Sequence, residues 1–410
     1  MSAADGRRDR ITVTGGHGGI AVALDDLTRA VVELTTAAEA LGSAAHRARR
    51  LDLWAVEVLL AGSDAVALLG RVEWQRSSLV GILRSAAGGL DDLAWRTRRA
   101  VTGYRVAEEE AALAARLARE SVVTVSRGLQ TVGDPAGLLR DGRPAPAVPV
   151  PVDAESRIEI HDLASVLTSQ SLLSGHPVVR VIEIPQPDGA SAWVLQIPGT
   201  QVWHPRAGPV AHDLTSDVRL MGHETGVLTR AALDALGQAQ AHSGRLDRDD
   251  PVMVTGHSLG GIAAMSIGAD PTARERFRIT HVVTAGAPVG HFTAPDDLVV
   301  LSLEHADDVV PRADLTANPD RPNWTTVRRE VPGGRMLLPG SGPSEHGALT
   351  YRETARLAAV AAATGSHSSL AAWSASAAPF FVRSSVGSPG AGPGQRVRDY
   401  RVARVTQSRS

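Results

Sequence analysis

The sequence predicts an α/β fold in its second half, preceded by an all-α region. Three observations carry this prediction. Short apolar runs with strand character alternate with helical segments between residues 178 and 363. Apolar residues repeat with heptad spacing over residues 24–45, and a stretch rich in proline and glycine, residues 133–156, lies between the two regions. Strands that alternate with helices favour a doubly wound, mostly parallel sheet.

The composition of the chain limits its size class and its partners. With 410 residues, the chain is long for a single domain, and two or three units are expected. A formal net charge of -2 gives no reason to expect a nucleic-acid partner. Because the sequence contains no cysteine, disulfides and thiolate metal sites are excluded.

The first 20 residues form a separate N-terminal segment in this interpretation. Residues 11–14, Ile-Thr-Val-Thr, alternate apolar and polar side chains as a short strand does. The residues before them are polar and charged, so we expect no cleaved signal peptide. No run of about 18 apolar residues occurs anywhere, so no membrane-spanning helix is expected either.

A helical domain is predicted over residues 21–132. Its first helix carries a seam of the a and d positions of a heptad, formed by Leu24, Leu27, Val31, Leu34, Ala38, Leu41 and Ala45. Helical sequence continues over residues 56–84, Gly88-Gly89 is typical of a turn, and a second long helix is expected from Leu90 to about Ser121. No cluster of ionisable residues converges here. We therefore expect a helical hairpin or small bundle rather than a catalytic domain.

The proline-rich stretch of residues 133–156 is predicted to be a linker, because proline removes a backbone donor and fixes φ. The α/β domain is then expected over residues 157–383. The remaining residues, 384–410, are rich in Gly, Pro and Ser and then in Arg, and are predicted to be a flexible tail. Within that tail, Tyr400–Val405 has the pattern of a short edge strand.

The expected elements of the α/β domain follow from their apolar periodicity. The strands are Val178–Ile184, Ala192–Ile197, Val252–Thr255, Ile279–Thr284, Leu298–Leu303 and Thr325–Val331, and the helices are Gly226–Ala241, Leu259–Gly268 and His346–Ala363. In open α/β sheets the functional site lies at the carboxyl ends of the strands.

The most informative stretch of the chain is Gly256-His257-Ser258-Leu259-Gly260-Gly261. It lies between an apolar strand and a helix of small residues, which is the context of a nucleophile elbow. The structural glycines Gly256 and Gly260 have no Cβ, so the strand and the helix can approach closely around the serine. This pattern predicts that Ser258 is an exposed nucleophile that needs a base and an acid.

The acid is expected just after a later strand. Asp307 and Asp308 both follow the strand Leu298–Leu303, and the residues alone do not choose between them. Glu304 is a weaker third candidate, because it lies closer to the strand.

The base is expected to follow the acid in the order Ser, acid, His. His346 opens the last helix and is the first histidine after His305, while the later His367 lies in a segment typical of a helix end. We therefore assign the base to His346. His257 is expected to point away from the serine, and His305 to serve local packing.

An oxyanion formed during acyl transfer needs two fixed N–H donors. One donor is the backbone N–H of Leu259, the residue after the nucleophile. The other is expected from the loop after an earlier strand. Thr200, in Ile197-Pro198-Gly199-Thr200, has that position.

Residues 155–365 resemble the class 3, or fungal-type, lipases. The resemblance rests on Gly199-Thr200, the elbow, Ala285-Gly-Ala-Pro-Val-Gly290, the run Asp308-Val-Val-Pro-Arg312 and His346. It implies an α/β-hydrolase fold, Thr200 as the oxyanion residue and Asp308 rather than Asp307 as the acid. It also implies a lid over residues 201–225, for which an ordinary loop with a short helix is the alternative. The chain departs from the family at Ile197-Pro198 and at His291, which affects the expected substrate preference.

Tyr104 and Glu108 fit the pattern Tyr-x-x-x-[Asp/Glu] on a long helix. This is similar to the export signal of type VII (ESX) secretion substrates. The resemblance implies export without a cleaved signal peptide, with a cytoplasmic location as the alternative, and a helical partner for the N-terminal domain.

The sequence thus predicts a serine hydrolase, a lipase or esterase that cleaves carboxylic esters of lipid or acylglycerol type. Ser258, His346 and Asp308 would form the triad and proceed through an acyl-enzyme, with no metal or organic cofactor. The alternative is a secreted effector or binding adaptor whose hydrolase domain is an acyltransferase or an inactive scaffold.

Overall fold

The computed structural model describes residues 11–16, 20–50, 63–133, 138–204, 206–331, 346–382 and 394–405. The chain forms two compact units. Residues 22–112 form a helical unit, and residues 1–21 together with 113–410 form an α/β unit. Among the described residues, no helix is both long enough and apolar enough to cross a membrane.

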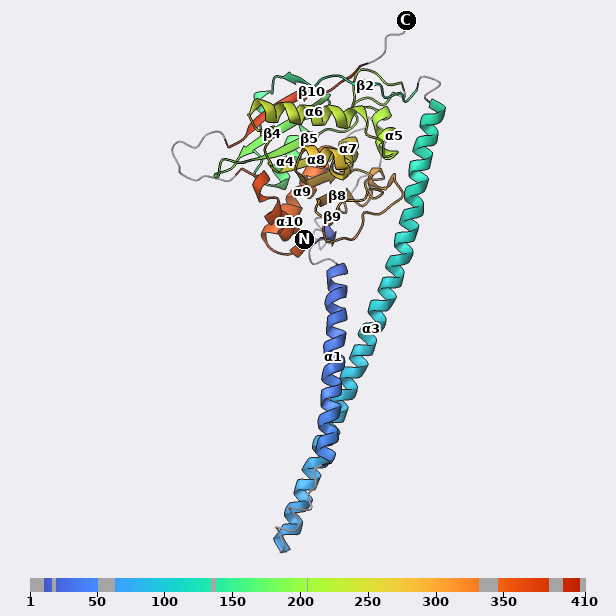
Figure 1. Ribbon diagram of the computed structural model, residues 1–410, viewed down its shortest axis with the longest axis vertical. Coiled ribbons are helices and arrows are strands. Elements are labelled where there is room, and N and C mark those ends of the chain that lie inside the picture. Colours follow the sequence, from blue (N-terminus) through green and yellow to red (C-terminus); the bar gives the residue numbers. More distant parts are fainter. Residues whose placement is uncertain are drawn as a thin grey trace, which may run out of the picture. The chain divides into compact units, whose positions relative to one another are not determined.

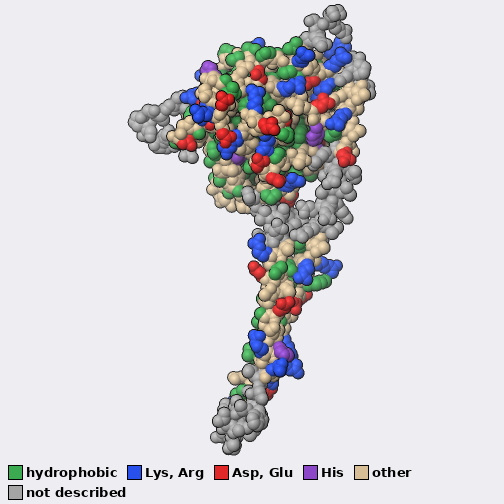
Figure 2. Space-filling view, in the orientation of Figure 1, with side chains coloured by type: hydrophobic (Ala, Val, Ile, Leu, Met, Phe, Trp, Pro, Cys, Tyr) green, Lys and Arg blue, Asp and Glu red, His purple; other side chains and the backbone are tan. Residues whose placement is uncertain are grey.

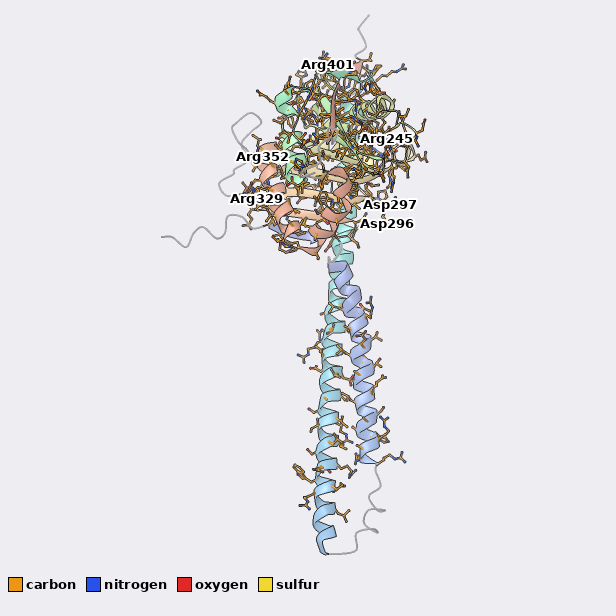
Figure 3. All side chains as sticks on the ribbon, turned by 90° about the vertical axis from the view of Figure 1, so that its left-hand side faces the viewer. Arg245, Asp296, Asp297, Arg329, Arg352 and Arg401 are labelled. Atoms are coloured by element: carbon orange, nitrogen blue, oxygen red, sulfur yellow. The ribbon has the colours of Figure 1, made fainter. Side chains whose placement is uncertain are left out.

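The helical unit consists of α1 (Ile20–Arg49) and the first part of α3 (Ser63–Gly133), which lie side by side (Figure 1). Val31, Ala38 and Ala45 of the predicted seam are buried. The side chain of Leu24 lies outside the described residues. On α3, Arg76 donates to the main-chain oxygen of Arg49 over 2.6 Å and so closes the end of α1. Figure 3 shows the side chains that both helices direct outward.

The predicted turn at Gly88-Gly89 is wrong, because α3 runs through these glycines without a break. Each glycine costs about 1 kcal/mol relative to alanine in a helix interior. Helix formers on both sides, such as Ala87 and Leu90, outweigh this cost. Tyr104 and Glu108 lie on the same helix, but their side chains are outside the described residues.

The α/β unit is built on a nine-stranded mixed sheet in the order β1-β9-β8-β7-β6-β5-β4-β10-β3. Its strands are β1 (Ile11–Gly15), β3 (Val148–Val150), β4 (Val178–Pro185), β5 (Ser191–Ile197), β6 (Val252–His257), β7 (Ile279–Ala285), β8 (Val299–His305), β9 (Trp324–Arg329) and β10 (Arg396–Arg401). The strands β5 to β9 are parallel, and the pairs β1–β9, β4–β5, β4–β10 and β10–β3 are antiparallel. A separate two-stranded sheet pairs β2 (Arg143–Pro144) with β11 (Arg404–Val405).

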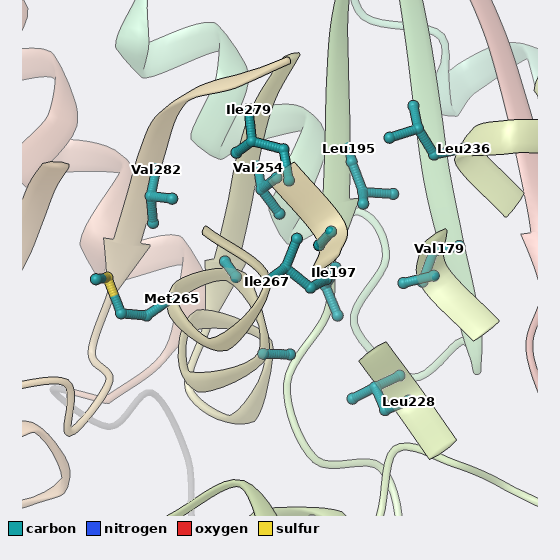
Figure 4. Close-up of a cluster of buried hydrophobic side chains, with 14 of the residues drawn as sticks. Val179, Leu195, Ile197, Leu228, Leu236, Val254, Met265, Ile267, Ile279 and Val282 are labelled. Atoms are coloured by element: carbon teal, nitrogen blue, oxygen red, sulfur yellow. The ribbon is translucent and has the colours of Figure 1, made fainter. Parts of the chain in front are cut away.

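Helices cover both faces of the large sheet. One face packs against α5 (Leu214–Met221), α6 (Val227–His242), α7 (Leu259–Ala269) and α8 (Pro271–Arg276). The other packs against α4 (Leu163–Ser171), α9 (Ala348–Ala363) and α10 (Ser368–Ser376). Short 3-10 helices are η1 (Ala154–Ser156), η2 (Val310–Arg312) and η3 (Ala378–Phe380). Figure 4 shows the first core, where aliphatic side chains of β4 to β7 meet those of α6 and α7.

An α/β fold with a largely parallel sheet was expected, but the winding differs from a doubly wound sheet. The parallel strands β5 to β9 are neighbours in chain order, so the strand order does not reverse. Right-handed crossovers then bring α6 and α7 to the same face. The opposite face is covered by helices that come before β4 and after β9 in the chain.

The segments at both ends of the chain also join the sheet. β1 pairs with β9, and β3, from the proline-rich stretch, lies at the far edge. Residues 396–401 of the tail, predicted to be flexible, form β10, which is paired on both sides rather than at an edge. A buried ion pair between Arg180 and Asp399, 2.8 Å long, fixes this strand on β4. On the face of the α/β unit that Figure 2 shows, acidic and basic side chains are mixed.

Candidate active site

Ser258 lies at the apex of a sharp turn between β6 and α7, with φ 55° and ψ -125°. A positive φ is strained for a residue with a side chain, and such strain collects at functional sites. A Cβ on Gly256 would overlap the backbone of Gly260, and a Cβ on Gly260 would overlap the main-chain oxygen of Ile197. Only glycine fits at these two positions, as the elbow pattern predicts.

Ser258, His346 and Asp308 form a continuous chain of hydrogen bonds. The distance from His346 Nε2 to Ser258 Oγ is 3.0 Å, and from His346 Nδ1 to Asp308 Oδ2 it is 2.8 Å. An ionised carboxylate only accepts hydrogen bonds, so Nδ1 carries the proton and Nε2 presents its lone pair to the serine hydroxyl. The three residues follow β6, follow β8 and precede α9, so parallel strands bring them to one edge of the sheet.

Asp308 is buried and fully engaged, whereas Asp307 is exposed. The Val310 N–H donates to Oδ1 over 2.9 Å, and the Tyr351 hydroxyl donates to Oδ2 over 2.8 Å. Burial alone would raise the pKa of Asp308, but hydrogen bonds and the attraction of His346 outweigh it and lower that pKa. The third candidate, Glu304, is bound instead to Asn318 and Arg328.

Tyr351 is a site residue that the sequence reasoning did not identify. It lies one turn into α9, accepts a hydrogen bond from the His305 N–H over 3.2 Å and donates to Asp308. Burial and the neighbouring Asp308 raise its pKa well above the usual value, so it remains a donor. Residue spacing offered no signal for it, because positions that share a helix face are three or four residues apart and Tyr351 comes five residues after His346.

His305 serves local packing, as expected. Its ring stacks on Tyr351 with centroids 3.8 Å apart, and its Nε2 lies 2.7 Å from Thr354 Oγ1. His367 precedes α10 and does not line the pocket at Ser258.

The two predicted oxyanion donors lie beside the serine. Leu259 is the first residue of α7, so its N–H has no acceptor within the helix. Gly199 packs so closely that an added Cβ would lie 3.1 Å from Ser258 Cβ. The Thr200 hydroxyl donates to Asp217 Oδ2 over 3.0 Å, which orients the turn. Burial raises the pKa of Asp217 to about 7.

A pocket of about 110 Å³ opens over Ser258 and His346. Its further lining residues include Gln170, Ser174, Thr200, Gln201, Trp203 and His257. Within the segment 201–225, for which a lid was one expectation, Leu220 of α5 is fully buried in the core. Apart from residue 205, the segment forms a loop with the short helix α5. Trp203 remains 56% exposed at the pocket.

In the described part of the chain, no group of three or more His, Asp or Glu side chains could hold a metal ion. Comparison with known proteins identifies no relative, since no family model, no curated protein and no solved structure matches this chain. An assignment of function therefore depends on the geometry around Ser258.

Proposed function

We propose that the protein is a serine hydrolase of carboxylic esters with an α/β-hydrolase fold. One observation carries the proposal: Ser258, His346 and Asp308 are joined by two hydrogen bonds in the order that nucleophilic catalysis needs. These residues are up to 88 positions apart in the chain. Packing of the hydrophobic core does not require these three side chains to meet at a strained turn.

The proposed reaction proceeds in two steps. His346 Nε2 takes the hydroxyl proton as Ser258 Oγ attacks the ester carbonyl, and Asp308 stabilises the imidazolium. The N–H groups of Leu259 and Thr200 hold the oxyanion, and collapse expels the alcohol, which receives the proton from His346. Water then attacks the acyl-enzyme by the same route and releases the acid. An acyltransferase would differ only in its acceptor, an alcohol in place of water.

An apolar ester of lipid or acylglycerol type is the proposed substrate class. Trp203 lines the pocket and is exposed, and Leu349, next to the pocket residue Ala348, is 63% exposed. Exposed aromatic and aliphatic side chains at a pocket favour an apolar ligand. The resemblance to class 3 lipases supports the same substrate class.

Labelling with a fluorophosphonate probe tests this proposal directly. The probe phosphonylates a serine only where a base and an oxyanion site activate it. We expect one label per chain, mapped by peptide mass spectrometry to Ser258, and none after heat denaturation. An intact, folded protein that takes up no label would indicate the alternative, a binding adaptor with an inactive scaffold.

A specific observation also favours a helical partner for the helical unit. Leu79, Ile82 and Leu93 of α3 recur at helical spacing and are 49%, 63% and 47% exposed. We infer that this stripe packs against the same stripe of a second copy of the chain. Sedimentation of the full chain should then show a dimer that Ile82→Glu with Leu93→Glu dissociates. A monomeric parent at high concentration would contradict self-association.

A further inference from the structure

His257, the second residue of the elbow, contacts the residue that carries the base. Its Nε2 lies 2.7 Å from the main-chain oxygen of His346. A carbonyl oxygen only accepts, so the His257 ring donates through Nε2–H. The two imidazole rings lie 4.9 Å apart between centroids, and the Tyr351 ring is 5.8 Å from that of His257. His257 was expected to point away from the serine; its Nε2 is directed to the His346 carbonyl, and the residue is part of the pocket lining.

The other side of the same ring lies against the turn Gly199-Thr200, which carries one of the two predicted oxyanion donors and is called the oxyanion turn below. A Cβ added to Gly199 would lie 3.3 Å from His257 Nδ1 and 3.1 Å from the His257 main-chain oxygen. Because His257 is covalently joined to Ser258, one residue thus borders the nucleophile, the base and the oxyanion turn.

Among the described residues, few other contacts fix the position of the main chain at His346. His346 directly precedes Gly347, the N-cap of α9, which has no side chain to cap the helix. The side chain of His346 is held by Asp308, but its backbone carbonyl is held by His257. A bond at the backbone limits how far the imidazole can shift along the Ser258–Asp308 line.

His257 Nε2 keeps its proton, and so remains a hydrogen-bond donor, over the pH range in which an esterase works. Burial, followed by the nearby His346, lowers the pKa of His257 to about 3. The ring is therefore neutral near pH 7. It adds no positive charge beside His346 when that residue becomes an imidazolium, so it can hold the base without opposing its protonation.

We propose that His257 is a positioning residue: its Nε2–H bond to the His346 carbonyl sets the distance from the base to Ser258. This inference rests on the proposed function for its effect on turnover, while the bond itself is a separate claim. A displacement of about 1 Å in a reacting group can cost about 100-fold in rate. Loss of the bond should therefore lower kcat and leave KM, which reflects ester binding, nearly unchanged.

Two variants separate the donor from the bulk of the ring. His257→Phe keeps a flat ring against His346 and Tyr351 but has no donor, whereas His257→Gln places an amide N–H near the position of Nε2. For p-nitrophenyl butyrate we expect His257→Phe to lower kcat about 10- to 100-fold, with an equal fall in the rate of fluorophosphonate labelling. His257→Gln should recover most of this loss. Circular dichroism and the melting temperature would confirm that both variants fold.

Parent kcat in His257→Phe, or an equal loss in both variants, would overturn the positioning role. A second measurement does not depend on activity. Nitrogen-15 spectra of histidine-labelled protein, with His257 assigned by its absence in His257→Gln, should show a neutral Nε2–H tautomer from pH 5 to 9. An Nδ1–H tautomer or a titration in that range would overturn the bond, and a parent that neither labels nor hydrolyses would overturn only the proposed function.

Discussion

Ser258→Ala is expected to abolish ester hydrolysis while the protein remains folded. Without Oγ there is no atom to form the acyl-enzyme, and His346 has no proton to take. Loss of a triad nucleophile lowers kcat by about 10⁴- to 10⁶-fold in serine hydrolases, with a residual rate from the oxyanion site. Initial rates with p-nitrophenyl butyrate, measured on purified parent and variant, cover this range.

The fold should survive the substitution, because alanine takes the same backbone conformation and leaves no larger group at the elbow. Ser258 also makes its backbone bond to the Ala285 oxygen, 2.9 Å long, through an N–H that alanine keeps. A melting temperature close to that of the parent checks this. Ser174→Ala is the matched control, since Ser174 lines the same pocket and should retain activity. If Ser258→Ala hydrolysed esters at the parent rate, the nucleophile would not be Ser258.

The elbow was predictable from the sequence because its constraints are local. Gly256 is required by the backbone of Gly260, four residues later, while the strand before is apolar and the helix after begins with small and apolar residues. Gly260 is the exception, because the atom that excludes a Cβ there is the main-chain oxygen of Ile197, far away in the chain. The chain order of Ser258, Asp308 and His346 was also readable, because parallel strands place their carboxyl ends at one edge.

The residues around the triad were not predictable in the same way. Tyr351 and His257 form hydrogen bonds to residues far away in the chain, to Asp308 and to the His346 carbonyl. No pattern within one segment records such a contact. The spacing of the residues alone allowed either Asp307 or Asp308 as the acid. The resemblance to class 3 lipases implied Asp308, and in the structure Asp308 is buried while Asp307 is exposed.

The fold predicted from the sequence was wrong at Gly88-Gly89 and in the C-terminal tail. Gly88-Gly89 has the composition of a turn, yet α3 continues through it. The tail is rich in flexible residues, but two of its charged side chains form buried ion pairs. Asp399 pairs with Arg180, and Arg404 pairs with Asp141 and Asp213. Burial of these charges is compensated only if the strands meet, and composition alone does not contain that information.

Asp308→Asn is expected to lower kcat by about 10⁴-fold, and Asp307→Asn to leave it near the parent value. The amide of asparagine can turn an N–H toward His346 Nδ1, which then must accept, so that the proton moves to Nε2. The base would face Ser258 without a lone pair. Asp307 is exposed on the adjacent position and provides the matched control. A large loss in Asp307→Asn with none in Asp308→Asn would move the acid to Asp307.

The same variant makes a prediction about stability that is independent of turnover. The pKa of Asp308 is lowered in the folded protein, so its carboxylate stabilises the fold above the unfolded pKa of about 3.9. That contribution is lost as the pH falls through the folded pKa. The melting temperature of Asp308→Asn should therefore lie below that of the parent by a constant margin from pH 5 to 8, and the margin should shrink below about pH 4. A margin that stays constant to pH 3 would mean that Asp308 is not held as a carboxylate by His346 and Tyr351, and the order of protons along the triad would have to be reassigned.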